Sequence, residues 1–224
     1  EYNILFRSLF KEGTKYRQVV ECLSKNMRGM TREELLQSLK WEDTGKVSAI
    51  LENLCNCDFL RCYAAYGKKE RSKMYQLTDM FTLFHLRFVK GYSGGDANHW
   101  STMANTKSIE AWSGYAFEQV CLSHISQIRQ ALGINGIQTD ISSWSVKGSH
   151  EKRGAQIDLV LERGDRIIDL CEMKFAEGRF TITKDYAEWL RERKDIFRES
   201  TKTSKTLHIV LVTTWGLQHN SYAS

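Results

Sequence analysis

The chain has 224 residues, which is enough for one large domain or for two small domains with a buried core. Hydrophobic residues make up 42% and charged residues 26%, values that exclude a disordered tail. No apolar run approaches the roughly 18 residues of a membrane span, and no N-terminal stretch has the pattern of a secretory signal. We therefore expect a cytoplasmic protein without a membrane partner, whose six cysteines are reduced.

The formal net charge is +5, and the excess lies in the first part of the chain. Lys and Arg outnumber Asp and Glu by 16 to 11 over residues 1–90, whereas the two counts are 16 and 16 over residues 91–224. A basic first segment is typical of contact with a polyanion such as a nucleic acid. An ordinary solvated surface explains the same excess equally well.

Apolar residues at helical spacing predict helices throughout the first 56 residues. One covers residues 2–9, and a second lies over about 16–23. A short helix of about ten residues begins with Thr31-Arg-Glu-Glu34, in which Thr and Glu have the spacing of a capping box. Another helix is expected over residues 44–56.

A basic hairpin is predicted to follow these helices. Residues 59–65 are expected to be extended, 67–73 to form a turn and 74–77 to form the returning strand. Three short helices and a basic hairpin resemble the winged helix-turn-helix modules of many prokaryotic regulators. A wing follows the phosphate backbone, so the expected nucleic-acid-binding residues are Lys68, Lys69, Arg71 and Lys73. The helix before the hairpin carries Lys46 against Glu52, and we expect it to read bases poorly.

Residues 81–88 predict one more apolar helix, and the glycine-rich stretch Gly91–Asp96 after it is the best candidate for a domain boundary. We expect a winged-helix domain over residues 1–90, a linker over 91–111 and a second domain over 112–224. In the second domain the expected elements are a helix at 112–132, strands at 137–146, 155–162 and 166–175, a helix at 183–198 and a strand at 207–213. The order α-β-β-β-α-β predicts an α/β fold, α+β over the whole chain.

Charged residues interrupt two of the predicted strands. By alternation, Asp158 lies on the face opposite Ile157 and Leu159, and Glu172 and Lys174 share one face because they are two residues apart.

The register of the hairpin decides whether Asp158 joins Glu172 and Lys174. A three-residue loop Arg163–Asp165, with Gly164 at the positive φ, would pair Glu162 with Arg166. Asp158 would then lie opposite Leu170, one diagonal step from Glu172. A two-residue turn would instead put the two acids on opposite faces.

Two carboxylates in partly apolar strands are costly to bury unless a cation holds them, and Mg²⁺ is the natural candidate. Mn²⁺ is the alternative ion. The metal keeps several waters and bridges to substrate phosphate, and one such water can become the nucleophile. Lys174 beside it would orient that water or neutralise charge that develops on the phosphate. The sequence therefore predicts a metal-dependent phosphodiesterase site at Asp158, Glu172 and Lys174.

The same residues carry a family resemblance. Gly154-Ala-Gln-Ile-Asp158, followed after thirteen residues by Glu172-Met-Lys174, resembles the PD-(D/E)XK nuclease superfamily, although Ile157 stands where the superfamily's name has Pro. The resemblance extends to prokaryotic AAA+/STAND-type ATPases whose C-terminal region carries a winged helix and a nuclease-like cap. The segments that carry it are Tyr115-Ala-Phe-Glu118, Cys171-Glu-Met-Lys-Phe175, Phe180-Thr-Ile-Thr-Lys184 and Gly216-Leu-Gln-His-Asn220.

The resemblance implies a restriction-endonuclease-like domain that acts on DNA. It implies that Asp158 and Glu172 are metal ligands, that the carbonyl of Met173 is a third ligand, that Lys174 is the catalytic lysine and that Glu118 is an auxiliary acid. It also implies a P-loop ATPase module upstream in the same polypeptide, so ATP would act only through a domain outside this sequence. The sequence is compatible with an oligomer.

Each of these residues also has a structural interpretation. In this interpretation Asp158 and Glu172 form a cross-strand ion pair with Lys174, and Glu118 is a solvated helix acid. His208 is expected to be a structural histidine, whereas Tyr186 begins the last helix and is a minor candidate for the cleft. The alternative function is a catalytically inactive module of an ATPase that binds DNA or a protein. The neutral charge of the second domain favours this alternative, whereas the complete set of motif residues favours the nuclease.

Overall fold

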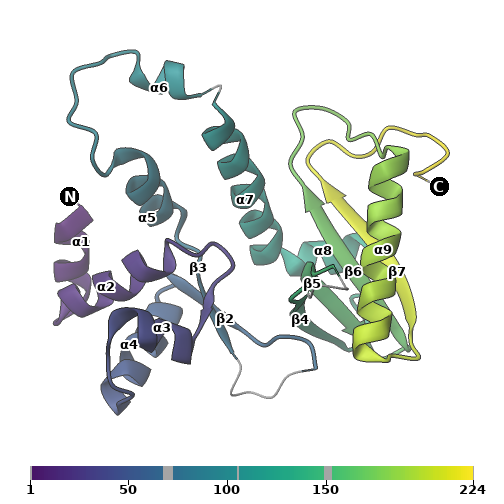
Figure 1. Cartoon of the computed structure of the whole chain (residues 1–224), viewed down its shortest axis with the longest axis horizontal. Coiled ribbons are helices and arrows are strands. Elements are labelled where there is room, and N and C mark those ends of the chain that lie inside the picture. Colours follow the sequence, from purple (N-terminus) through teal and green to yellow (C-terminus); the bar gives the residue numbers. More distant parts are fainter. Residues whose placement is uncertain (1, 68–72, 105, 149–152, 224) are drawn as a thin grey trace. The chain divides into compact units, whose positions relative to one another are not determined.

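The computed structural model describes residues 2–67, 73–104, 106–148 and 153–223 (Figure 1). Helices take 45% and strands 22% of the chain, which confirms a mixed α/β protein. The chain divides into two compact units, residues 1–96 and 97–224, and each is described by itself. The division follows Asp96, the last residue of the glycine-rich stretch. Among the described residues, no helix is both long and apolar enough to cross a membrane.

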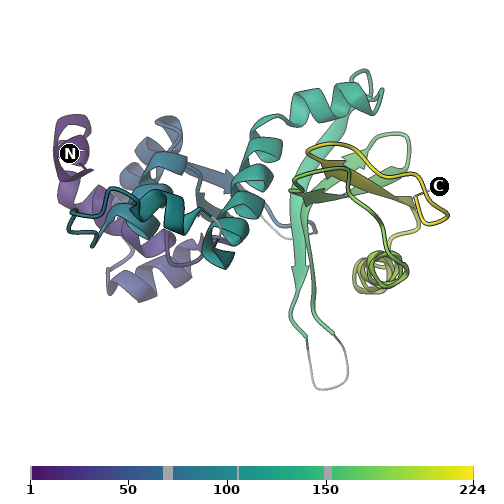
Figure 2. The same cartoon turned by 90° about the horizontal axis from the view of Figure 1, so that it is seen from above.

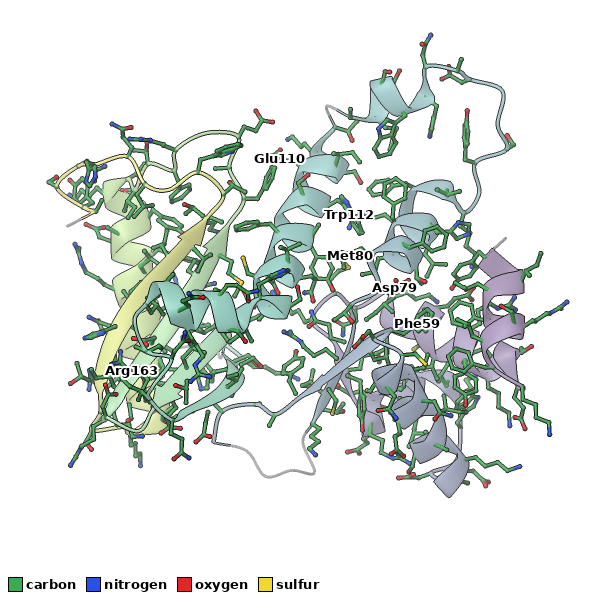
Figure 3. All side chains as sticks on the ribbon, turned by 180° about the vertical axis from the view of Figure 1, so that it is seen from behind. Phe59, Asp79, Met80, Glu110, Trp112 and Arg163 are labelled. Carbon is green, nitrogen blue, oxygen red and sulfur yellow. The ribbon has the colours of Figure 1, made fainter. Side chains whose placement is uncertain are left out.

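Short amphipathic helices build most of the first unit. They are α1 (Tyr2–Leu9), α2 (Gly13–Leu23), α3 (Arg32–Leu39), α4 (Gly45–Asn56) and α5 (Met80–Phe84). Thr31 and Glu34 form the predicted capping box at the start of α3, each side chain accepting the other's backbone N–H. Phe59 closes the core, with its ring 5.4 Å from that of Phe6 (Figure 3). The hydrophobic stripes predicted from the sequence are therefore the buried sides of these helices.

A small antiparallel sheet completes this unit, with strand order β1-β3-β2. Its strands are β1 (Met30–Thr31), β2 (Leu60–Tyr63) and β3 (Met74–Leu77). The two-residue β1 was not expected. Gly29, just before it, has φ +83°, and a Cβ there would lie 2.7 Å from the carbonyl oxygen of Tyr75, so only glycine fits. Of the predicted wing residues, Lys73 is described, whereas Lys68, Lys69 and Arg71 lie outside the described residues.

The apolar helix expected over residues 81–88 changes its geometry halfway. It begins as α5, with Asp79 accepting from the backbone N–H of Thr82, and continues as the π-helix η2 (His85–Val89). π-helical turns are rare and often occur at functional sites.

The second unit is a four-stranded sheet between helices. Its elements are α6 (His99–Met103), α7 (Lys107–Ser123), α8 (Ile125–Ala131), β4 (Thr139–Val146), β5 (Ala155–Arg163), β6 (Ile167–Lys174), α9 (Lys184–Thr201) and β7 (Thr206–Thr213). The strand order is β4-β5-β6-β7, antiparallel except for the parallel pair β6 and β7. The expected linker over residues 91–111 therefore contains α6 and the first turn of α7.

The helix expected over residues 112–132 is two helices, because it breaks at His124. The Nδ1 atom of His124 lies 2.7 Å from the carbonyl oxygen of Val120, which would otherwise accept the backbone N–H of His124. That N–H bonds to Cys121 instead. A local side-chain contact thus replaces one helical hydrogen bond and ends α7.

The two faces of this sheet pack against different helices (Figure 2). On one face, Leu159, Leu161, Cys171 and Met173 form an apolar cluster with Cys121 and Leu122 of α7. On the other face lies α9, whose Phe197 is fully buried and contacts Trp144 of β4, with ring centroids 5.0 Å apart. The candidate site lies on this second face.

Candidate active site

Glu172 is the centre of the candidate site. It lies near the end of β6 with 8% of its surface exposed, and both of its carboxylate oxygens meet a cation. Nη1 of Arg193, on α9, donates to Oε2 at 2.8 Å, and Nζ of Lys174 lies 3.1 Å from Oε1. Burial of a carboxylate is tolerable only with such partners, so the three side chains form one unit.

Both cations also lie against the ring of Trp189, and Lys174 lies against the ring of Tyr186 as well. The guanidinium carbon of Arg193 lies 3.6 Å from the ring centroid of Trp189. Nζ of Lys174 lies 5.7 Å from that ring and 5.6 Å from the ring of Tyr186. The two rings stack on each other with centroids 5.1 Å apart. Cation–π contact therefore holds each positive charge beside Glu172.

The electrostatics of Glu172 are dominated by burial. Burial raises the pKa of its carboxyl above the ordinary value of 4.5, although the charges of Lys174 and Arg193 act in the opposite direction. The charge of Asp158 raises it further. The pKa of Tyr186 is also raised, first by burial and then by the charge of Glu172. A buried acid whose pKa is shifted by burial and by named charges is a common property of functional sites.

Asp158 lies at an irregularity in β5. The pairing with β4 steps from Ser142 opposite Val160 to Trp144 opposite Ile157, so two residues of β5 face one of β4. This bulge breaks the alternation along the strand. Directly paired residues share a face, and Trp144 packs on α9. Ile157 therefore lies on the α9 side and not on the side of Leu159, which corrects the predicted alternation.

The hairpin register also differs from the prediction. Glu162 pairs with Ile168 rather than Arg166, a shift of two residues that keeps the parity. The positive φ falls on Arg166, at 68°, and not on Gly164. The pairing of β5 with β6 extends back to Leu159 opposite Cys171. Asp158 comes next on β5. Its Oδ1 accepts from Nε2 of Gln156 at 2.5 Å, and its charge acts on Glu172.

The structure therefore brings Glu172 and Lys174 into contact and places Asp158 within electrostatic reach. Glu118 is on α7, the helix that covers the other face of the sheet, where its charge raises the pKa of Cys121 after burial. The side chain of Met173 packs in the α7 cluster, and its carbonyl belongs to the backbone between Glu172 and Lys174.

Arg193 and Trp189 were missed by the sequence reasoning. They share a helix face with Tyr186, because positions 186, 189 and 193 follow the spacing of one stripe. A cation on an otherwise aromatic stripe was the available signal. Which strand this stripe packs on is a matter of tertiary structure.

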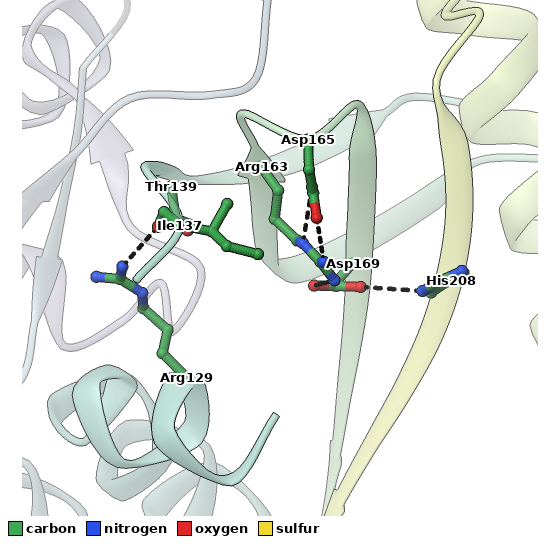
Figure 4. A network of polar contacts seen from close by, with 7 residues as sticks. All are labelled: Arg129, Ile137, Thr139, Arg163, Asp165, Asp169 and His208. Carbon is green, nitrogen blue, oxygen red and sulfur yellow. Dashed lines mark hydrogen bonds and ion pairs between the residues drawn. The ribbon is translucent and has the colours of Figure 1, made fainter. Parts of the chain in front are cut away.

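A second buried acid lies at the other end of β6. Asp169 is 2% exposed, and Nη1 of Arg163 lies 3.4 Å from its Oδ2. Nδ1 of His208 lies 3.5 Å from its Oδ1, which gives this histidine a structural contact (Figure 4). Arg163 also pairs with Asp165 in the hairpin loop and lowers the pKa of that carboxyl. This network ties the loop to β6 and β7.

Within the described part of the chain, no group of three or more His, Cys, Asp or Glu side chains is arranged to hold a metal ion. The donors available at the site are the carboxylates of Asp158 and Glu172. Mg²⁺ in phosphate-handling sites is often held by one or two carboxylates and completed by water and substrate phosphate. The chain supplies two such carboxylates here, and among the described residues they do not form a protein cage.

Comparisons of the chain with family models, with curated proteins and with solved structures gave no match.

Proposed function

We propose that residues 97–224 form a Mg²⁺-dependent nuclease of the PD-(D/E)XK kind that acts on DNA. The observation that carries the proposal is the buried Glu172 in contact with Lys174, with Asp158 acting on it from the neighbouring strand. The order α7-α8-β4-β5-β6-α9-β7, with β7 parallel to β6, supports a restriction-endonuclease-like domain. In this proposal the helices and small sheet of residues 1–90 are a winged helix, and an ATPase module lies upstream.

In this proposal Asp158 and Glu172 hold the ion, with the Met173 carbonyl as a further ligand. Bound there, Mg²⁺ supplies an activated water and offsets charge on the phosphate. Lys174 donates to the attacked phosphate or to the water, because its amine lies beside Glu172 and against two rings. Glu118 lies on α7, over the other face of the sheet, and takes no part in this proposal.

A second candidate function is a catalytically inactive module that binds DNA or a protein partner. The observation that favours it is the balance of charge: Asp158 and Glu172 are offset by Lys174 and Arg193, so the four side chains sum to zero. A neutral cluster attracts a divalent ion less than two unpaired acids would. The four residues would then be structural.

The two functions are separated by incubating the protein with supercoiled plasmid and linear DNA in Mg²⁺, Mn²⁺ or EDTA. We expect ion-dependent cleavage, and Lys174→Ala and Glu172→Gln each to reduce it by a factor of about 10² or more, the scale of a lost preorganised electrostatic contact. Arg191→Gln, at an exposed position of α9, is the control and should cut as the parent does. Equal cleavage by all four proteins would exclude this site, and binding without any cleavage would favour the inactive module.

A further inference from the structure

Arg193 has two contacts that place it more tightly than a solvated helix arginine. Its guanidinium donates to Oε2 of Glu172 at 2.8 Å and lies 3.6 Å from the centroid of Trp189. Its side chain is 24% exposed, so part of this side chain is open to solvent. A flat guanidinium fixed against an aromatic ring keeps its remaining N–H donors in a set direction, which suits a phosphate or a carboxylate.

The oxygen that Arg193 occupies is one that a metal ion would need. Glu172 has two oxygens, and in the structure Arg193 takes one and Lys174 the other. A divalent ion bound to Glu172 would therefore compete with both cations for this carboxylate, because it adds positive charge beside them. The charge count agrees, because the four side chains sum to zero and an added divalent ion would bring the cluster to a net charge of +2, which attracts an anion.

We infer that Arg193 is a second phosphate-binding residue of this site, an inference that rests on the proposed function. When no metal is bound, Arg193 neutralises Glu172. When a metal ion binds Glu172, Arg193 donates its hydrogen bond to the DNA phosphate instead. Lys174 lies beside the same carboxylate and against the same ring of Trp189. The two cations thus reach the phosphate from the strand side and from the helix side.

This role predicts that removing Arg193 raises the affinity for the metal ion and lowers the rate of DNA cleavage. Without Arg193, the side chains of Asp158, Glu172 and Lys174 have a net charge of −1 when no metal is bound. One oxygen of Glu172 also loses its hydrogen bond, so a divalent ion should bind more tightly. The DNA phosphate loses a charged donor, so cleavage should fall. A purely structural arginine predicts no such opposition, because its loss would loosen Glu172 and weaken both properties together.

The test compares the parent with Arg193→Gln, which keeps a polar side chain without the charge, Arg193→Lys, which keeps the charge, and Arg191→Gln, the same change at an exposed position of α9. Mn²⁺ and Mg²⁺ are titrated without DNA while thermal melting is followed, and plasmid cleavage is measured separately. For Arg193→Gln we expect the ion concentration at half-maximal stabilisation to fall about 3- to 10-fold, the scale of a surface-proximal charge interaction. Cleavage should fall about 10²-fold, and Arg193→Lys should recover part of both.

If the parent binds ions and cuts DNA, but Arg193→Gln leaves ion binding unchanged or weaker, this inference is overturned and the proposed function stands. If the parent neither responds to the ions nor cuts, the proposed function and this inference fall together. If Arg193→Gln prevents folding, Arg193→Lys decides, because it should cut less than the parent while it binds ions at least as tightly.

Discussion

Replacing Asp158 by asparagine separates a metal ligand from a structural ion pair without any need to know the substrate. The change removes one of the two negative charges at the site and keeps the size of the side chain. In the structure, Oδ1 of Asp158 accepts from Gln156 at 2.5 Å, and the asparagine oxygen can accept the same hydrogen bond. The substitution therefore tests charge rather than packing.

Two effects set the stability of the metal-free variant, and they oppose each other. The hydrogen bond from Gln156 weakens by about 1 kcal/mol when its acceptor becomes neutral. The repulsion of Glu172 by Asp158 disappears, which offsets part of this loss. Because Arg193 and Lys174 already balance the two acids, we expect the free energy of unfolding to stay within about 1 kcal/mol of the parent.

The response to ions should differ much more. For a dissociation constant of ~1 mM and ~10 mM Mg²⁺, linkage gives about 1.4 kcal/mol of stabilisation in the parent. This corresponds to a rise of about 3–5 °C in Tm for a chain of this size. We expect the rise to be lost in Asp158→Asn.

The assay is thermal melting of parent and variant in EDTA, Mg²⁺ and Mn²⁺ at matched ionic strength. Tryptophan fluorescence suits it, because five of the six tryptophans lie in residues 97–224. A structural ion pair predicts the reverse pattern, in which Asp158→Asn is destabilised and divalent ions raise both Tm values equally. That result would refute Asp158 as a metal ligand.

Three further predictions concern the wing, the second buried acid and pH. Alanine at all four predicted wing residues (Lys68, Lys69, Arg71 and Lys73) should flatten the salt dependence of DNA binding by up to about four phosphate contacts, and an unchanged slope would assign this hairpin to protein docking. Asp169→Ala should lower the free energy of unfolding by about 3 kcal/mol, because it leaves Arg163 without its buried partner. Asp165→Ala, in the exposed loop, should lower it clearly less. Equal losses of the two variants in urea unfolding would contradict this prediction. The folded-state pKa of Glu172 is raised, so ionisation of this group costs stability as pH rises from the unfolded-state value of 4.5 through the higher folded-state value. Relative to the parent in EDTA, Glu172→Gln should therefore gain stability between pH 4 and pH 7, and a constant difference across this range would show that the pKa is not raised.

Local sequence signals predicted the elements well. The capping box Thr31–Glu34 fixed the start of α3, and alternation placed Glu172 and Lys174 on one face of β6. Strand β3 has the predicted bounds, residues 74–77. These features depend on residues within a few positions of one another, so periodicity and capping are sufficient to find them.

The misses depend on partners far along the chain or on loop geometry. The bulge at Asp158 arises from pairing with β4, and no local pattern around Asp158 indicates it. The register depends on whether Gly164 or Arg166 has the positive φ. Glycine adopts a positive φ most easily, but in the structure the positive φ is at Arg166. Arg193 joins the site only because α9 packs across β6. The acids and the lysine of the site were thus predictable from the sequence, whereas the arginine that brings their net charge to zero was not.

Strand β6 buries a carboxylate on each of its faces, and this has a consequence for the fidelity of folding. Asp169 faces the α7 side with Arg163, and Glu172 faces α9 with Arg193. A slip of one residue would exchange the two faces, moving Glu172 toward Cys121 and away from Arg193, and Asp169 away from Arg163. Each misregistered sheet would then bury two unpaired carboxylates, at several kcal/mol apiece. The two acids therefore increase the free-energy difference between the native sheet and sheets with a shifted register. With two apolar residues in their place, β6 would still form a strand, but its register with β5 and β7 would be less strongly specified.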